Sequence, residues 1–205
     1  MQPNRLSATA ARPEVLRRVL WLQIFTIVWM TAEAGIALVA ARAAQSPALL
    51  GFGGDSAIEL FSAVAVLWRF FSDSERAEKI AARIAGVLLL MLAVYVAIAS
   101  ALALAGHREP QPSLAGIMLL MVAAAGMPWL ARRKRRLADQ TGSASLRADA
   151  AESAVCGYLS WIALAGLVVN ATFHQSWADP LAALALLPLI VKEGWKSIRA
   201  SGAES

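Results

Sequence analysis

Long apolar segments separated by short polar ones dominate the pattern of this 205-residue chain. Each apolar segment has about 20 residues, the length that a helix needs to cross a hydrocarbon core of about 30 Å. The pattern predicts six membrane-spanning helices, at residues 18–41, 47–71, 84–105, 114–131, 142–172 and 180–198. We therefore expect an all-α membrane protein, a six-transmembrane-helix bundle surrounded by a lipid bilayer.

The apolar segments leave little sequence for other domains. Residues 1–16 are expected to form a cytoplasmic tail, residues 17–199 one transmembrane domain, and residues 200–205 a short C-terminal tail. A signal peptide is a weaker alternative, because an apolar run and TAEA, similar to a cleavage site, follow Arg18. The apolar pattern resumes as GIALVAA after Glu33, so the first segment is interpreted as a span.

Composition agrees with this class. The chain is 59% hydrophobic and 16% charged, whereas soluble domains average about 25% charged residues. The single cysteine, Cys156, excludes an intramolecular disulfide and a Cys-rich zinc module. The net charge of +5 does not indicate a nucleic-acid partner, because the basic residues lie in short segments between apolar runs.

The uneven distribution of Lys and Arg predicts the orientation. Alternate connections carry nearly all of these residues: Arg5, Arg12, Arg17, Arg18, Arg69, Arg76, Lys79, Arg83, the run RRKRR at 132–136, Lys192, Lys196 and Arg199. The other connections carry only Arg42 and Arg108. The positive-inside rule then places both termini in the cytoplasm. RRKRR is interpreted as a topology anchor, with a contact to anionic lipids as the alternative.

Acidic residues inside the predicted spans are the strongest functional signal, because each costs at least about 2.5 kcal/mol in a membrane helix. In GFGGDSAIEL, Asp55 and Glu59 are four residues apart and share one helix face. The fifth span also carries polar residues at helical spacing, which form a stripe on one face of that helix. The stripe consists of Ser145, Asp149, Glu152, Ser153 and Cys156.

Helix start signals predict that the acids of both spans lie inside the membrane. Ser46-Pro47 signals the start of the second span, and Thr141 is expected to cap a fifth span that begins at Gly142. At 1.5 Å per residue, the acids of the second span would lie about 12 and 18 Å from the outer surface. The acids of the fifth span would lie about 10 and 15 Å from the inner surface. The carboxylates are therefore expected to converge near the middle of the membrane as a cation site.

Such a site suits divalent cations. Carboxylate and hydroxyl oxygens bind Zn²⁺, Mn²⁺, Fe²⁺ or Mg²⁺, and a thiolate at Cys156 would favour softer ions. Four carboxylates in a low-dielectric pocket cannot all stay ionised when no cation is bound, so some take up protons. A divalent cation would displace these protons, which predicts metal/proton exchange.

These residues resemble those of a known family. ALLGFGGDSAIELFSAVAVLWRF, the acid on the fifth span and WADPLAALALLPLIVKEGW are similar to the transmembrane domain of cation diffusion facilitators, over residues 16–198. The resemblance implies a homodimer that exports zinc, or a related ion such as manganese or iron, in exchange for protons. We expect a multi-pass protein of the bacterial inner membrane.

The family motifs can be placed on this chain residue by residue. Members usually carry Asp-x-x-x-Asp, or His in the first place, where Asp55 and Glu59 stand. On the fifth span they carry His-x-x-x-Asp, of which Asp149 matches the acid while Ser145 replaces the imidazole that best favours zinc. Glu152 or Cys156 could substitute from the same stripe. No cytoplasmic metal-binding domain is expected, as in the short, tail-less members.

Other features are open to a functional or a structural interpretation. Glu33 is a candidate for proton coupling, or a structural helix-bonding group. A ridge of small residues on the third span is a candidate dimer face, and it consists of Ala93, Ala97, Ala101 and Ala105. Asp179-Pro180 is interpreted as a structural start signal of the sixth span. His107 and His174 are interpreted as solvated loop residues.

Two alternatives to transport remain. The first is a non-transporting membrane partner or metal sensor whose acids form a structural polar network. The second, a membrane enzyme, has little support, because the chain lacks a Gly-rich phosphate loop, HExxH, GxSxG and CxxC. Cys156, the candidate nucleophile, is better interpreted as a small core residue. We therefore expect a transporter and not an enzyme.

Overall fold

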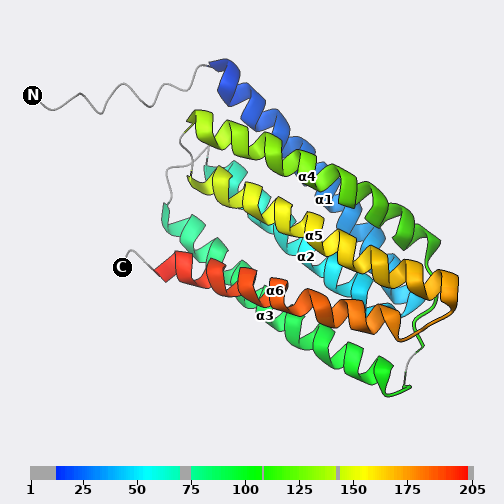
Figure 1. Ribbon diagram of the computed structural model, residues 1–205. Helices are drawn as coiled ribbons and strands as arrows, with labels where there is room; N and C mark the ends of the chain where they lie inside the picture. The colour runs from blue at the N-terminus through cyan, green and yellow to red at the C-terminus, as the bar shows by residue number, and fades with distance from the viewer. Residues whose placement is uncertain (1–12, 70–74, 108, 142–143, 203–205) are drawn as a thin grey trace, which may run out of the picture.

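The computed structural model describes residues 13–69, 75–107, 109–141 and 144–202, and these residues form six helices and no strand. The helices are α1 (Pro13–Ala44), α2 (Pro47–Arg69), α3 (Glu75–Leu104), α4 (Leu114–Thr141), α5 (Ala144–Phe173) and α6 (Ala178–Gly202). They run side by side, and α1 begins at the end of the bundle where α6 finishes (Figure 1). The all-α prediction is confirmed.

The outer surface of the bundle is suited to lipid. Within the described chain, α1, α3, α4 and α5 are long and apolar enough to cross a membrane by length and composition alone. Large apolar side chains such as Val39 and Leu114 are 72% and 75% exposed, which in a soluble protein would be an aggregation liability. α2 and α6 carry buried acids within apolar sequence and lie alongside the other four helices (Figure 1).

The six helices pack as a group of four and a pair. α1 packs on α2, and α4 on α5, while contacts between α2 and α5 and between α1 and α4 join them into a four-helix group. α3 packs mainly against α6, and this pair lies against α2 and α5 (Figure 1). The space between the pair and the four-helix group is bordered by α2, α3, α5 and α6, and it contains the candidate site.

Glycines allow α3 and α6 to approach closely. A Cβ added at Gly86 would lie 2.6 Å from the carbonyl oxygen of Gly194, a backbone atom that cannot give way alone. We expect Gly86→Ala to lower the melting temperature of the detergent-purified protein, although alanine improves helix propensity by about 1 kcal/mol. Gly35→Ala is the matched control, because a Cβ there meets nothing within 4 Å. A Gly86→Ala protein as stable as its control would contradict the close contact.

The fourth helix is longer than predicted. The expected span ended at residue 131, but α4 continues to Thr141, so RRKRR at 132–136 is helical. The four arginines of this run are exposed, whereas Lys134 is fully buried. The topology-anchor interpretation is therefore wrong for Lys134, because the helical period places it on the same inward face as the buried residues four positions before and after it.

The start of the fifth helix also differs from expectation. Thr141 is the last residue of α4, and its hydroxyl donates to the carbonyl oxygen of Leu137 at 2.8 Å. α5 begins at Ala144, and Gly142 lies outside the described residues. The predicted cap at Thr141 is therefore wrong: its side chain bonds back into the preceding helix.

The N-terminus of α2 is capped by residues from two helices. The Ser46 hydroxyl accepts a hydrogen bond from the Leu49 amide at 3.1 Å, which confirms the predicted cap. Asp179, in the first turn of α6, accepts from the Ala48 amide at 3.1 Å and from the Ser46 hydroxyl. These contacts support a structural role for Asp179, but the predicted cap of the sixth span is wrong, because α6 begins at Ala178 and the amide that Asp179 binds belongs to α2. This contact ties the two helices together at one end of the bundle.

The alanine ridge of α3 does not form one exposed face. Ala93 is buried in the core of the same chain, whereas Ala97 is half-buried and Ala101 is exposed. The proposed ridge is therefore wrong at Ala93, and the homodimer remains a prediction. His107 and His174 are exposed, as predicted.

Candidate cation site

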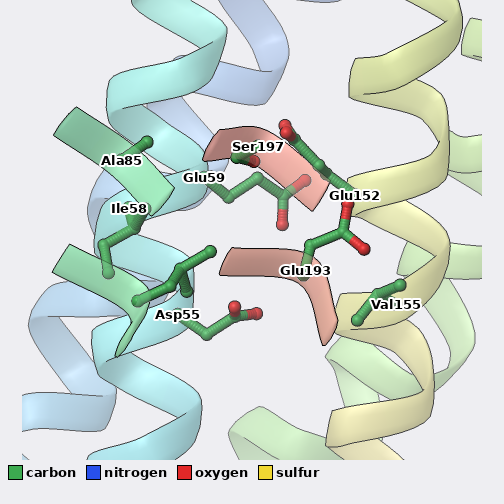
Figure 2. A pocket seen from close by; sticks show the side chains of 9 residues that line it. Asp55, Ile58, Glu59, Ala85, Glu152, Val155, Glu193 and Ser197 are labelled. Atoms are coloured by element: carbon green, nitrogen blue, oxygen red, sulfur yellow. The ribbon is translucent and has the colours of Figure 1, made fainter. Parts of the chain in front are cut away.

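A pocket lined by carboxylates lies between α2, α3, α5 and α6. Asp55 and Glu59 point into it from α2, Glu152 from α5 and Glu193 from α6 (Figure 2). Its volume is about 20 Å³, which is room for roughly one water-sized ion. The rest of the wall is mostly apolar, and it consists of Ile58, Ala85, Leu89, Val155 and Ser197. Acids so placed interact strongly, because the apolar wall keeps the local dielectric constant low.

Three side chains beside this pocket can act as ligands of one ion. Asp55, Glu59 and Cys156 are buried, and each offers one ligand atom within 4.8 Å of the other two. Asp55 and Glu59 are one helical turn apart on α2, and Cys156 comes from the adjacent α5. The group therefore combines two carboxylate oxygens with one sulfur.

Glu59 has one satisfied and one unsatisfied oxygen. Its Oε1 accepts a hydrogen bond from the Ser153 hydroxyl at 2.7 Å and lies 4.0 Å from the Lys134 ammonium. Its Oε2 is buried and has no hydrogen-bond partner among the described residues. A buried acceptor without a partner is costly, and a cation in the pocket would remove that cost.

Asp149 lies next to this group, in an ion pair. Its Oδ1 accepts from the Lys134 ammonium at 2.8 Å, and its Oδ2 accepts from the Gln23 amide at 2.8 Å. Lys134 also donates to the Ser153 hydroxyl at 2.8 Å. Asp149, Lys134, Gln23 and Ser153 are all buried. The ion pair therefore lies between α1, α4 and α5, and the hydrogen bond from Ser153 to Glu59 connects it to α2.

Glu33 is a further buried acid in contact with Cys156. Its carboxylate accepts from Trp29 Nε1 at 2.6 Å, from the Ser56 hydroxyl at 2.8 Å and from the Cys156 thiol at 3.6 Å. The expectation that Glu33 joins the polar interior is confirmed by these contacts. Its role in proton coupling stays a prediction.

The polar stripe of α5 is largely buried, but its members face different partners. Glu152 and Cys156, four residues apart, lie at the pocket and at the two acids of α2. Asp149 pairs with Lys134, and Ser153 lies between Lys134 and Glu59, with a hydrogen bond to each. The register inferred from the family motif placed Asp149 among the ligands. In the structure Cys156 belongs to the ligand group and Glu152 lines the pocket, whereas Asp149 pairs with Lys134. The side chain of Ser145 lies outside the described residues.

Sequence reasoning missed three polar residues of this region. Lys134 was hidden in a basic run, although its position four residues from Leu130 and from Ala138 was a signal. Glu193 was overlooked among the basic residues at the end of α6, where it is buried and accepts from Lys196 at 2.9 Å. Gln23 gave no signal, because an amide within a span is not charged.

Comparison with known proteins identifies the family. A profile of the cation efflux transmembrane domain matches residues 74–204, which is more than half of the chain and includes α3 to α6. No curated protein matches the chain. The matched helices supply Lys134, Asp149, Glu152, Cys156 and Glu193 to the region described above. The chain therefore belongs to the cation efflux family, whose members transport metal cations across membranes, and it carries the transmembrane domain of that family.

Proposed function

We propose that this protein exports a divalent cation from the cytoplasm, in exchange for protons, as a homodimer in the bacterial inner membrane. Family membership supports cation transport. The observation that carries the site is the approach of ligand atoms from Asp55, Glu59 and Cys156 to within 4.8 Å of one another, beside a pocket. Buried acids in a membrane bundle commonly mark an ion pathway.

The donor set favours zinc as the cargo, with iron and manganese as alternatives. Zinc is bound by sulfur and by carboxylate oxygen, mostly with four ligands. Asp55, Glu59 and Cys156 would supply three ligands, and Glu152 is placed to supply the fourth from the pocket wall. A purely oxygen-based set would favour manganese or magnesium instead.

In this proposal, the closely spaced acids of the site bind the protons that are exchanged for the cation. Closely spaced acids in an apolar pocket hold protons when no cation is bound, because ionised neighbours repel one another. A bound divalent cation would displace these protons. Glu33 accepts a hydrogen bond from the Cys156 thiol, so it is placed to take up the thiol proton when sulfur binds the metal.

Transport is tested with purified protein in liposomes that contain a zinc indicator and a pH indicator. We expect zinc influx together with proton movement in the opposite direction, and neither signal in liposomes without protein. The sensor alternative predicts zinc binding without flux. Zinc flux without proton movement would contradict antiport alone.

A further inference from the structure

Lys134 places an ammonium group beside the proposed cation ligands. It is fully buried, and its ammonium lies 2.8 Å from Asp149 Oδ1 and 4.0 Å from Glu59 Oε1. Two carboxylates therefore compete for one ammonium, and in this structure Asp149 holds it more closely. The other basic residues of the same run are exposed and cannot replace it.

We propose that Asp149 and Lys134 are positioning residues that set the cation affinity of the site, and that Asp149 is not itself a ligand. This inference rests on the proposed function. By binding the ammonium, Asp149 keeps Lys134 from becoming the full counter-ion of Glu59. Glu59 Oε1 then accepts its hydrogen bond from the Ser153 hydroxyl, and Glu59 Oε2 remains available to bind the cation.

The position of Lys134 also limits how tightly the cation is held. An ammonium this close to Glu59 repels a divalent ion bound there, and in a low-dielectric interior such repulsion is stronger than in water. A transporter must release its cargo, so an affinity lowered in this way favours turnover.

The inference predicts opposite effects for two variants. In Asp149→Asn, Lys134 loses its charged partner, and the nearest remaining carboxylate in this network is Glu59. Changes in residues that orient a metal ligand typically cost about 10- to 100-fold in affinity, so we expect cobalt(II) to bind at least about tenfold more weakly. In Lys134→Met/Asp149→Asn the competing ammonium is gone as well, and we expect affinity equal to or tighter than wild type.

The single variant is expected to fold. Gln23 donates to Asp149 Oδ2 through its amide nitrogen, while its Oε1 is buried without a hydrogen-bond partner among the described residues. If the Gln23 amide rotates, its Oε1 accepts a hydrogen bond from the side-chain amide that Asp149→Asn introduces. The double variant removes both members of a buried ion pair, which is often tolerated better than removal of one.

The experiment measures cobalt(II) binding to the full-length protein in detergent by visible absorption, which reports both affinity and ligand set. Weaker binding with an unchanged spectrum in Asp149→Asn, and recovery in the double variant, would support the inference. Arg135→Met/Asp139→Asn is the matched control, because it removes one basic and one acidic residue from exposed positions of α4. It is expected to bind like wild type.

Two results would overturn the inference. Wild-type affinity in Asp149→Asn would show that Asp149 does not restrain Lys134. Weak binding with an altered spectrum in both variants would show that Asp149 is a ligand. If Asp149→Asn does not fold, the double variant tests the inference alone. Affinity at least equal to wild type would support the inference, and weaker binding would contradict it. A failure of the proposed function would be recognised by a different result. Wild-type cobalt(II) affinity in Asp55→Asn would show that the ion does not bind at the proposed site.

Discussion

Asp55→Asn is expected to abolish cation transport while the protein still folds. Asp55 is a buried acid at the pocket and a member of the three-residue ligand group. The amide retains the shape of the side chain but loses the negative charge that a divalent ion needs. Because loss of an outer partner of a metal ligand already costs about 10- to 100-fold in affinity, loss of a ligand should cost at least about 100-fold.

The measurement is zinc flux into liposomes, with zinc binding in detergent as a second readout. Asp139→Asn is the matched control, because it makes the same chemical change at an exposed residue that pairs with Arg147 on the surface. We expect wild-type flux from the control. Wild-type flux from Asp55→Asn would show that the cation crosses without this carboxylate, and the proposed site would have to be abandoned.

Cys156→Ser is expected to change which metal the site prefers. Thiolate sulfur favours zinc and cadmium, whereas a hydroxyl oxygen favours harder ions such as manganese. Serine can also donate to Glu33 in place of the thiol, so the hydrogen bond to that carboxylate has a substitute. We expect zinc and cadmium to bind at least about tenfold more weakly. This is the loss of affinity seen when a residue that orients a metal ligand is changed. Manganese binding should change little.

Competition between metals in one binding assay measures this preference directly. Ala163→Ser is the control, because it adds the same hydroxyl at a fully buried residue of α5 away from the ligand group. An unchanged ratio of zinc to manganese affinity in Cys156→Ser would show that sulfur does not coordinate the cargo. The carboxylates would then have to account for selectivity alone.

Much of the fold follows from local sequence. Apolar segments of membrane-spanning length predict the number of helices, because a lipid-exposed backbone must satisfy its hydrogen bonds within the helix. Ser46-Pro47 fixes the start of α2, since the cap and the proline act on adjacent residues. The shared face of Asp55 and Glu59 is equally local, because four residues make about one helical turn.

Helix ends were less predictable where polar residues continue a helix. The basic run after residue 131 has the composition of a loop, yet α4 extends through it to Thr141. Arginine and lysine are good helix formers, and the extended turns pack Lys134 and Ala138 against neighbouring helices. The charge of this run therefore did not mark the end of the helix.

The sequence alone predicted six apolar helices with acids inside them, and the described residues form six helices that bury those acids. Only the tertiary structure decided that Cys156 joins Asp55 and Glu59, and that Lys134 holds Asp149. The physical reason is helix rotation: in a membrane bundle both the lipid-facing and the core-facing sides are apolar, so local pattern does not fix the side that turns inward. Packing between helices fixes it, and so determines which charged groups meet.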